Sequence, residues 1–459
     1  MSPITLTALI LFAVTYILMM AFQKIRPYIA VTSAVLFVTL GVIAALKPDL
    51  FGTGFFAIDG GSYAYGFGAA LREIDWNVMM MIAGTMGTVY LFIESKMPNL
   101  MSDVLVSKMP NVKWVVVMLS LFAGVVSAFV DNVATVLMIA PVALAFCKKL
   151  KISPVPAIIC IAISSNLQGA ATLVGDTTSI LLAKAAQLDF SDFFVDNGHI
   201  GMFFVVEAGA VVAAALIYVM FRKEKAPIDH SERTKVEDKF PTVLLIGTVL
   251  MLIAVSFIPY KEAAAPGRIY KPGITNGLIC MGFFAVGLIR ELARKNFDTV
   301  KNAFKEIDYY TIVLLAGLFV VIGGIKNAGV IEVIGQTIAN CGGGSKFAVF
   351  TIIVWVSVLF SAFIDNIPYT ATMLAIVPTI AAGCGLEGES VKLLYYGLLC
   401  GATLGGNLTP IGASANIAGI GILRKEGYEV RSSTFMKYGV PFTLAAVITG
   451  YLMLWFIWG

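Results

Sequence analysis

Apolar residues fill most of the chain in long runs, and short polar stretches separate one run from the next. Many of these runs approach the 20 or so residues that an α-helix needs to cross a membrane. Apolar and polar positions do not alternate every second residue, as they would in the strands of an outer-membrane barrel. The pattern therefore predicts an all-α polytopic membrane protein.

The apolar runs form two series of similar layout. In the first series we expect helices at 3–22, 28–46, 78–94, 155–186 and 199–221, and a pair of apolar arms at 114–147. In the second series we expect helices at 242–258, 276–289, 309–325, 391–422 and 437–458, and a pair of arms at 347–383. A polar stretch with six Lys and Arg residues separates the series. The predicted domains are a first repeat at 1–221, a linker at 222–241 and a second repeat at 242–459.

Short sequence motifs recur at matching places in the two series. Residues 127–132 (SAFVDN) lie between the arms of the first pair, and residues 361–366 (SAFIDN) lie between the arms of the second pair. Outside the arms, residues 72–76 (REIDW) match residues 305–309 (KEIDY). The chain therefore reads as a duplication.

Each repeat is predicted to contain about five transmembrane helices plus one hairpin. Because five is odd, the two repeats have opposite orientations in the membrane, and the fold class is one of inverted-topology repeats. With the linker in the cytoplasm, most of the 32 Lys and Arg residues fall in loops predicted to be inside, as the positive-inside rule requires. We therefore expect an integral multi-pass protein of a prokaryotic-type plasma membrane, with both termini outside.

The paired arms allow two interpretations. Each pair can be a re-entrant hairpin with a polar tip, or two short helices that cross the membrane fully. The arms are long for half-crossings at 1.5 Å per residue. We favour re-entrant hairpins, because a polar tip at membrane depth is tolerated where it lines a cavity within the protein.

Composition supports the membrane assignment. Hydrophobic residues make up 59% of the chain and charged residues only 13%, and the mean hydropathy is +0.89. Soluble domains carry about 25% charged residues. The six cysteines are scattered without paired spacing, so neither a disulfide framework nor a cysteine metal site is predicted.

Asp131 and Asp365 lie within the apolar arms. A carboxylate costs at least about 2.5 kcal/mol at the bilayer centre, and ionisable residues placed there commonly mark ion or substrate pathways. Alternatively, each Asp caps the half-helix that follows it, which is worth about 1 kcal/mol. The two roles are compatible, because a charged cap at that depth still needs compensation.

Residues 169–180 can be aligned with residues 406–417, and both segments place Gly and hydroxyl residues in the middle of a predicted helix. This composition predicts helices that are broken near the midplane. A broken helix frees N–H groups at one end and carbonyl groups at the other, and both can bind ions.

The predicted central site combines the hairpin tips with the helix breaks. Aspartates supply charge and proton positions, whereas Asn, Thr and Ser supply neutral oxygens suited to sodium. The neutral side chains can alternatively cross-link helices. A sodium position is predicted at Asp131, Asn132, Asp365 and Asn366. The full set of candidate ligands is Asp131, Asn132, Thr135, Asn166, Thr172, Asp176, Thr177, Asp365, Asn366, Thr370, Asn407, Thr409, Ser414 and Asn416.

The tips, together with residues 170–176 (AATLVGD) and 406–412 (GNLTPIG), resemble the ion transporter superfamily. The resemblance is to the branch of arsenite permeases and sodium/proton antiporters with a citrate-transporter-like domain. It implies a central ion and substrate site, a scaffold part, a mobile transport part and often a homodimer. Related dicarboxylate/sodium symporters have Ser-Asn-Thr at the tips, whereas a fixed Asp there would repel a dianion.

We therefore predict an ion-coupled secondary active transporter, most simply a sodium (cation)/proton antiporter. The alternative is a permease for arsenite or another small inorganic or carboxylate anion, coupled to protons or sodium. An intramembrane aspartyl protease is a rival from another class, because the chain also has two intramembrane acids. We expect no cofactor apart from the transported or coupling ion, and no nucleic-acid partner; the partners are the lipid bilayer, a small ion or molecule and a second copy of the chain.

Overall fold

The computed structural model describes residues 3–46, 57–58, 61–62, 65–224, 226, 234–236, 238–258 and 271–459. Within them the chain is almost entirely helical, as the hydrophobic pattern predicts. The strands are two short antiparallel pairs, β1 (Ala57–Ile58) with β2 (Gly61–Ser62) and β3 (Val195–Asp196) with β4 (His199–Ile200).

The helices of the first repeat follow the predicted order, with two additions. Short helices, α4 and α6, precede and follow α5 in segments where the sequence analysis expects no transmembrane helix. The elements are α1 (Pro3–Ala21), η1 (Gln23–Ile25), α2 (Arg26–Leu46), α4 (Phe67–Glu73), α5 (Trp76–Glu94), α6 (Met97–Ser107), α7 (Val112–Ser127), α8 (Asn132–Lys149), α9 (Val155–Gly169), α10 (Thr177–Ala186), η2 (Ser191–Phe193) and α11 (Met202–Met220).

The second repeat has the same order of elements. Here α14 and α16 take the places of α4 and α6. The elements are α12 (Phe240–Ser256), α13 (Thr275–Ala293), α14 (Phe297–Lys305), α15 (Tyr309–Asn327), α16 (Val330–Cys341), α17 (Lys346–Ser361), α18 (Asn366–Gly383), α19 (Glu389–Gly405), η4 (Gly406–Leu408), α20 (Ser414–Lys425) and α21 (Ser432–Trp458).

Helix packing repeats the same pairs in both halves. Helix α2 packs on α15 as α13 packs on α5, and α7 packs on α9 as α17 packs on α19. The two repeats also pack against each other, because α10 packs on α18 and α20 packs on α8. Helices α11 and α21, which end the two repeats, pack on each other. The duplication read from the sequence is therefore also a duplication of the fold.

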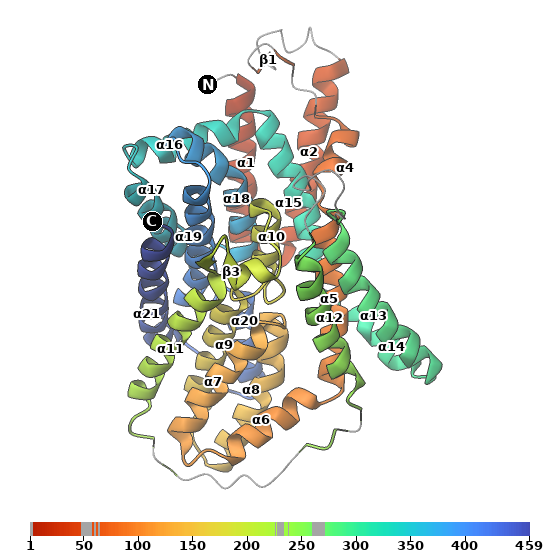
Figure 1. Ribbon diagram of the computed structural model, residues 1–459, viewed down its shortest axis with the longest axis vertical. Helices are drawn as coiled ribbons and strands as arrows, with labels where there is room; N and C mark the ends of the chain where they lie inside the picture. Colours follow the sequence, from red (N-terminus) through yellow and green to blue (C-terminus); the bar gives the residue numbers. More distant parts are fainter. Residues whose placement is uncertain are drawn as a thin grey trace.

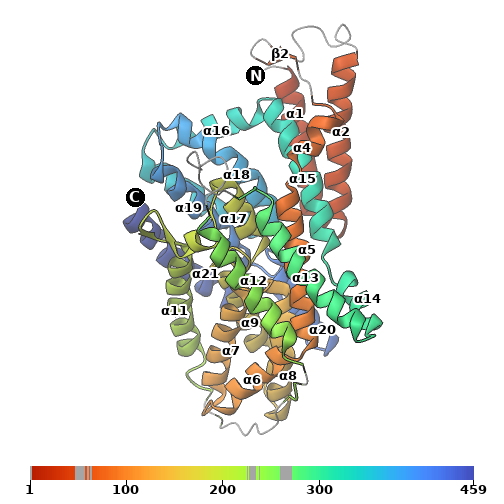
Figure 2. The ribbon, with the colours of Figure 1, turned by 45° about the vertical axis from the view of Figure 1, so that its right-hand side comes forward.

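The two hairpins enter the molecule from opposite ends. Helix α6 leads into the hairpin α7–α8 near the bottom of the ribbon, and α16 leads into the hairpin α17–α18 near the top (Figure 1). The turned view shows the same arrangement (Figure 2). This placement is what inverted repeats require.

Among the described residues, eight helices are long and apolar enough to cross a membrane, or nine if α16 and α17, which are bent by 116°, form one span. The two predicted broken helices are each divided into two shorter helices, α9 with α10 and α19 with α20. By its length and composition, helix α8 could cross the membrane without α7. The re-entrant form of the hairpin therefore stays a prediction.

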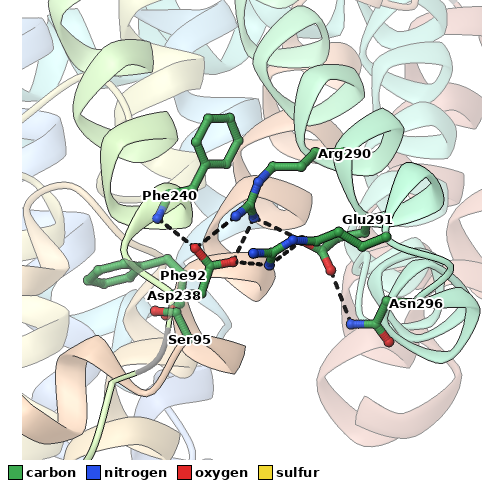
Figure 3. A network of polar contacts seen from close by, with 8 residues as sticks. Phe92, Ser95, Asp238, Phe240, Arg290, Glu291 and Asn296 are labelled. Carbon is green, nitrogen blue, oxygen red and sulfur yellow. Dashed lines mark hydrogen bonds and ion pairs between the residues drawn. The ribbon is translucent and has the colours of Figure 1, made fainter.

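The end of the linker is fixed to α13. Both terminal nitrogens of Arg290 donate to Asp238, at 2.6 and 3.0 Å, and Arg294 donates to the same carboxylate at 2.6 Å (Figure 3). The hydrogen bond from Arg290 holds the pKa of Asp238 below its ordinary value. The remainder of this network joins Asn296 to Glu291.

Candidate functional site

Each hairpin tip is fixed to the helix break of its own repeat by one threonine. The hydroxyl of Thr172 donates to the carbonyl of Ala128, and the hydroxyl of Thr409 donates to the carbonyl of Ala362. These hydrogen bonds satisfy carbonyls at the end of the first arm, which a buried helix end requires. Both threonines therefore position the tips.

Two glycines let the breaks approach the tips closely. A Cβ atom on Gly175 would lie 2.7 Å from the carbonyl oxygen of Ser127, and one on Gly412 would lie 2.9 Å from that of Ser361. No side chain fits at such distances without a shift of the backbone. Glycine is thus required here by close approach.

Asn416 also stabilises a break. Its amide nitrogen donates to the carbonyls of Gly406 and Thr409 at 3.0 and 3.2 Å. The matching residue in the first repeat, Ser179, donates to Gly169 at 3.4 Å. This contact is the cross-linking alternative for Asn416.

A chain of buried amides joins the two repeats. The Nδ2 atom of Asn132 donates to Asn166 Oδ1 at 3.0 Å. The Nδ2 atom of Asn166 donates to the Thr403 carbonyl at 2.8 Å and to Asn407 Oδ1 at 3.1 Å. Asn407 donates in turn to the carbonyl of Ile163 at 2.9 Å. Three predicted ligands, from the first hairpin tip and from the two broken helices, therefore meet at the centre.

Asp176 lies at the edge of this chain and is buried. It accepts from the Thr178 hydroxyl at 3.0 Å and from the Asn366 amide, contributed by the other repeat, at 3.4 Å. The Thr178 hydroxyl also lies 3.2 Å from that of Thr403. Asp176 thus accepts hydrogen bonds from both repeats.

Asp131 has two roles in the structure. It caps α8 by accepting from the N–H groups of Val133 and Ala134 at 3.0 and 3.1 Å, which confirms the capping interpretation. Together with Asp176 and Thr177, it also lines a small cavity with a volume of about 20 Å³. This space holds about one water molecule or one bare ion.

The described residues contain no group of three or more His, Cys, Asp or Glu side chains that could hold a metal ion. A cation in this pocket would be bound by two carboxylates and by threonine hydroxyl or backbone carbonyl oxygens. Such mixed oxygen sites at helix breaks suit sodium.

Asp365 has a different environment from Asp131. It caps α18 through the Ile367 N–H at 3.2 Å, but it also accepts from Arg26 at 2.8 Å and from Ser414 at 3.4 Å. The sequence predicts Arg26 in a loop between two spans. That prediction is wrong, because Arg26 begins α2 and is 4% exposed.

Two predicted ligands lie apart from these contacts. Thr135 and Thr370 are fully buried, and neither hydroxyl has a hydrogen-bond partner among the described residues. The structure thus brings together Asp131, Asn132, Asn166, Asp176, Thr177, Asn366 and Asn407 around the centre. It places Asp365 and Ser414 with Arg26, and Thr172, Thr409 and Asn416 in the breaks.

Sequence reasoning missed Arg26, Thr178 and Thr403. A signal for Thr403 was present, because the alignment that matches Gly169 with Gly406 also matches Asn166 with Thr403. Thr178 lies two residues after Asp176, in the first turn of α10. For Arg26 no local signal exists.

A sequence profile of the family described as citrate transporter matches residues 16–401, more than half of the chain. The chain belongs to the citrate transporter family. A 46 kDa membrane protein of Mycobacterium leprae is 28% identical over 464 residues, which cover 99% of this chain and 98% of that protein. An uncharacterised transporter of Mycobacterium tuberculosis is 28% identical over 458 residues, 98% of each chain.

The solved structure of the YdaH transporter of Alcanivorax borkumensis is similar in fold. The TM-score is 0.61 at 14% identity, and the match covers 93% of this chain and 97% of YdaH. Family and fold together make this chain a secondary transporter that is integral to the membrane and passes through it several times. It is not an enzyme, so the aspartyl protease alternative is removed.

Proposed function

We propose that this member of the citrate transporter family exchanges a cation for protons, and that the cation is sodium. One observation carries the proposal. Asp131 and Asp176 line the same small pocket, and among the described residues neither forms an ion pair with a basic side chain. Asp176 is buried and Asp131 is partly buried. Carboxylates held there without a compensating cation are costly, so the site favours a bound cation or protons.

The dimensions of the pocket also favour a small ion. The cavity volume is about 20 Å³, far less than the 300–1,000 Å³ or so of typical small-molecule sites. A carboxylate anion would in addition meet two acids. The oxygens of Asp131, Asp176 and Thr177 supply the hard ligands that a sodium ion prefers.

Protons and the cation compete for the same two carboxylates in this scheme. Asp131 and Asp176 repel each other when both are charged. Asp308 adds to the negative charge near Asp131, and Asp365, which is paired with Arg26, lies near Asp176. Two acids that share a site do not ionise independently. A cation that binds at one side can therefore be released at the other when protons replace it.

A permease for arsenite or another small anion is the second candidate. It is favoured by Arg26, whose buried Nη2 atom has no hydrogen-bond partner among the described residues. A guanidinium with a free donor can hold an oxygen of an anion, and neutral arsenous acid would not be repelled by the acids.

We further propose the membrane orientation that the basic residues favour, with linker 222–241 in the cytoplasm. Cysteines introduced into the linker should resist impermeant thiol reagents added to whole cells. Labelling from outside would show that the linker lies on the opposite side of the membrane.

The predicted homodimer is tested by the mass of the purified protein in detergent.

A flux screen in proteoliposomes tests the proposed exchange. Vesicles that contain the protein and a pH-sensitive dye receive sodium, potassium, lithium, arsenite or small carboxylates in separate experiments. We expect proton movement with sodium and none in vesicles that carry Asp131→Asn. Proton-coupled uptake of arsenite or carboxylates without any sodium response would contradict this exchange and support the anion permease.

A further inference from the structure

We propose that Arg26 is a fixed counter-cation for Asp365, which keeps the transported cation away from the second hairpin tip. The inference rests on the proposed function, because it concerns the same central site. The duplicated tips predict two equivalent acidic positions. The structure assigns a built-in cation to one of them.

The ion pair joins two parts of the protein that are far apart in sequence. Arg26 begins α2 and Asp365 lies at the tip of α17–α18, and the Arg26 Nη1 atom is 2.8 Å from the Asp365 Oδ2 atom. Their side chains are only 5% and 9% exposed. At this burial a carboxylate needs a partner, and Arg26 provides it.

The contact uses only one nitrogen of the guanidinium for the carboxylate. The Nε atom of Arg26 donates to the carbonyl of Met19 at 3.1 Å, and Nη2 has no partner among the described residues. Arginine forms its most specific carboxylate contacts with two parallel hydrogen bonds. A single contact supplies charge without that fork geometry, so charge is the property that this position requires.

The second repeat also contributes a buried base, Lys271, but this base forms an ion pair with Asp189, which lies outside the first hairpin tip. Lys271 lies just before α13, as Arg26 lies at the start of α2. It donates to the carbonyl of Val255 at 3.1 Å and to Asp189 at 2.6 Å. Asp189 follows α10, so the whole of that helix separates this ion pair from Asp176. Asp131 therefore stays uncompensated while Asp365 is neutralised.

Neutralisation at one tip changes what the centre can bind. With Asp365 paired, two acids remain for the transported ion and its protons. The second hairpin is also held by α1, because the Tyr16 hydroxyl donates to the carbonyl of Pro368 at 2.7 Å. The cation site is therefore asymmetric, and it is centred on the first tip.

The test compares sodium binding in variants that remove the charge of Asp365, of both residues, or of neither. Calorimetry at about pH 9, where carboxylates are ordinarily ionised, compares the wild type with D365N, the double variant R26Q/D365N and R26K. In D365N the unpaired guanidinium should weaken sodium binding at least about tenfold. The double variant has no stray charge and should return to within about threefold of the wild type. R26K, which keeps the charge, should also stay within about threefold.

A double variant that binds sodium as weakly as D365N would overturn the inference, because Asp365 would then be a ligand itself. A tenfold loss in R26K would contradict a role through charge. The matched control is K271Q/D189N, which removes the ion pair beyond α10 and should leave sodium affinity unchanged; a tenfold change there would mean that any buried pair has this effect.

Failure of the proposed function has a separate signature. A wild type that binds no sodium at any pH ends the cation proposal. The Arg26 assignment is then decided by unfolding temperatures of R26Q, D365N and the double variant in detergent. Coupled effects of the two substitutions support it, and additive effects overturn it.

Discussion

The two hairpin tips share a sequence motif and a backbone design but not an electrostatic environment. Both tips place an Asp at the start of the second arm, and in both a threonine of the helix break donates to a tip carbonyl. Asp131 faces a second carboxylate across a small pocket, whereas Asp365 faces Arg26. A duplicated motif therefore specifies local geometry, and residues outside the motif decide the charge.

The helix breaks differ in the same way. Asp176 in the first break aligns with Ala413 in the second, and Thr178 aligns with Ala415. The first break thus supplies a carboxylate and a hydroxyl hydrogen-bonded to it at 3.0 Å. The second break keeps the backbone shape without that charge. Both differences concentrate negative charge near Asp131.

The largest effect should separate the two tip acids. Asp131→Asn should weaken sodium binding by about 100-fold or more, because a charge in direct contact with the ion is lost. Asp365→Asn should weaken binding less, about tenfold. Asn caps helices as well as Asp does, so both variants should fold. Equal losses measured by calorimetry would restore the symmetric interpretation of the tips.

Substitution of the close-packed glycines should show where the tips are alike. Gly175→Ala and Gly412→Ala each force an added methyl group against a backbone carbonyl, and each should cost about 1–3 kcal/mol of stability. Gly421→Ala is the control, because a Cβ atom there meets nothing within 4 Å. Unfolding temperatures in detergent measure all three. A neutral result at Gly175 with a loss at Gly412 would break the equivalence of the breaks.

The amide chain should show a smaller dependence. Asn166→Ala removes the partner of the Asn132 amide and of the Asn407 carbonyl group. Buried polar groups without partners cost about 1–3 kcal/mol each, of which relaxation and water recover part. We expect reduced stability and a sodium affinity lowered less than in Asp131→Asn. An affinity loss as large as that of Asp131→Asn would make Asn166 a direct ligand.

The smallest effect is expected away from the tips, at the end of the linker. Hydrogen bonding lowers the pKa of Asp238, so its contribution to stability is present above the ordinary carboxylate pKa of about 3.9. That contribution is lost as pH falls through the lowered value. Asp238→Asn should therefore cost less than about 1 kcal/mol at neutral pH and nothing at about pH 2. An equal loss at both values, measured by thermal unfolding, would contradict this.

Local rules explain what the sequence could predict. Apolar runs, Asp residues before apolar arms and Gly-rich breaks each have meaning within a few residues, and they predicted the helices, the capped tips and the divided helices correctly. The sequence predicted that the tips and the breaks combine in one site, but the individual contacts of Asn132 with Asn166 and of Asp176 with Asn366 come from the structure. Thr403 could have been found by the same alignment.

Long-range partners explain what the sequence could not predict. Arg26 and Asp365 are 339 positions apart, and a basic residue between two apolar runs ordinarily marks the membrane interface. Lys184 and Glu207 both lie within predicted helices, and the sequence allows them to pair. In the structure Lys184 is exposed and contacts Asp75 at 3.1 Å instead. Which buried charge meets which depends on tertiary packing.

Calorimetric binding of sodium and of arsenite between about pH 5 and 9 tests the central proposal most directly, because it follows the competition of protons for carboxylates. If Asp131 and Asp176 exchange protons for a cation, sodium affinity should rise with pH and level off once both acids are ionised. Arsenite should show no such rise. Absence of sodium binding at every pH, together with saturable arsenite binding that strengthens on acidification, would contradict the account.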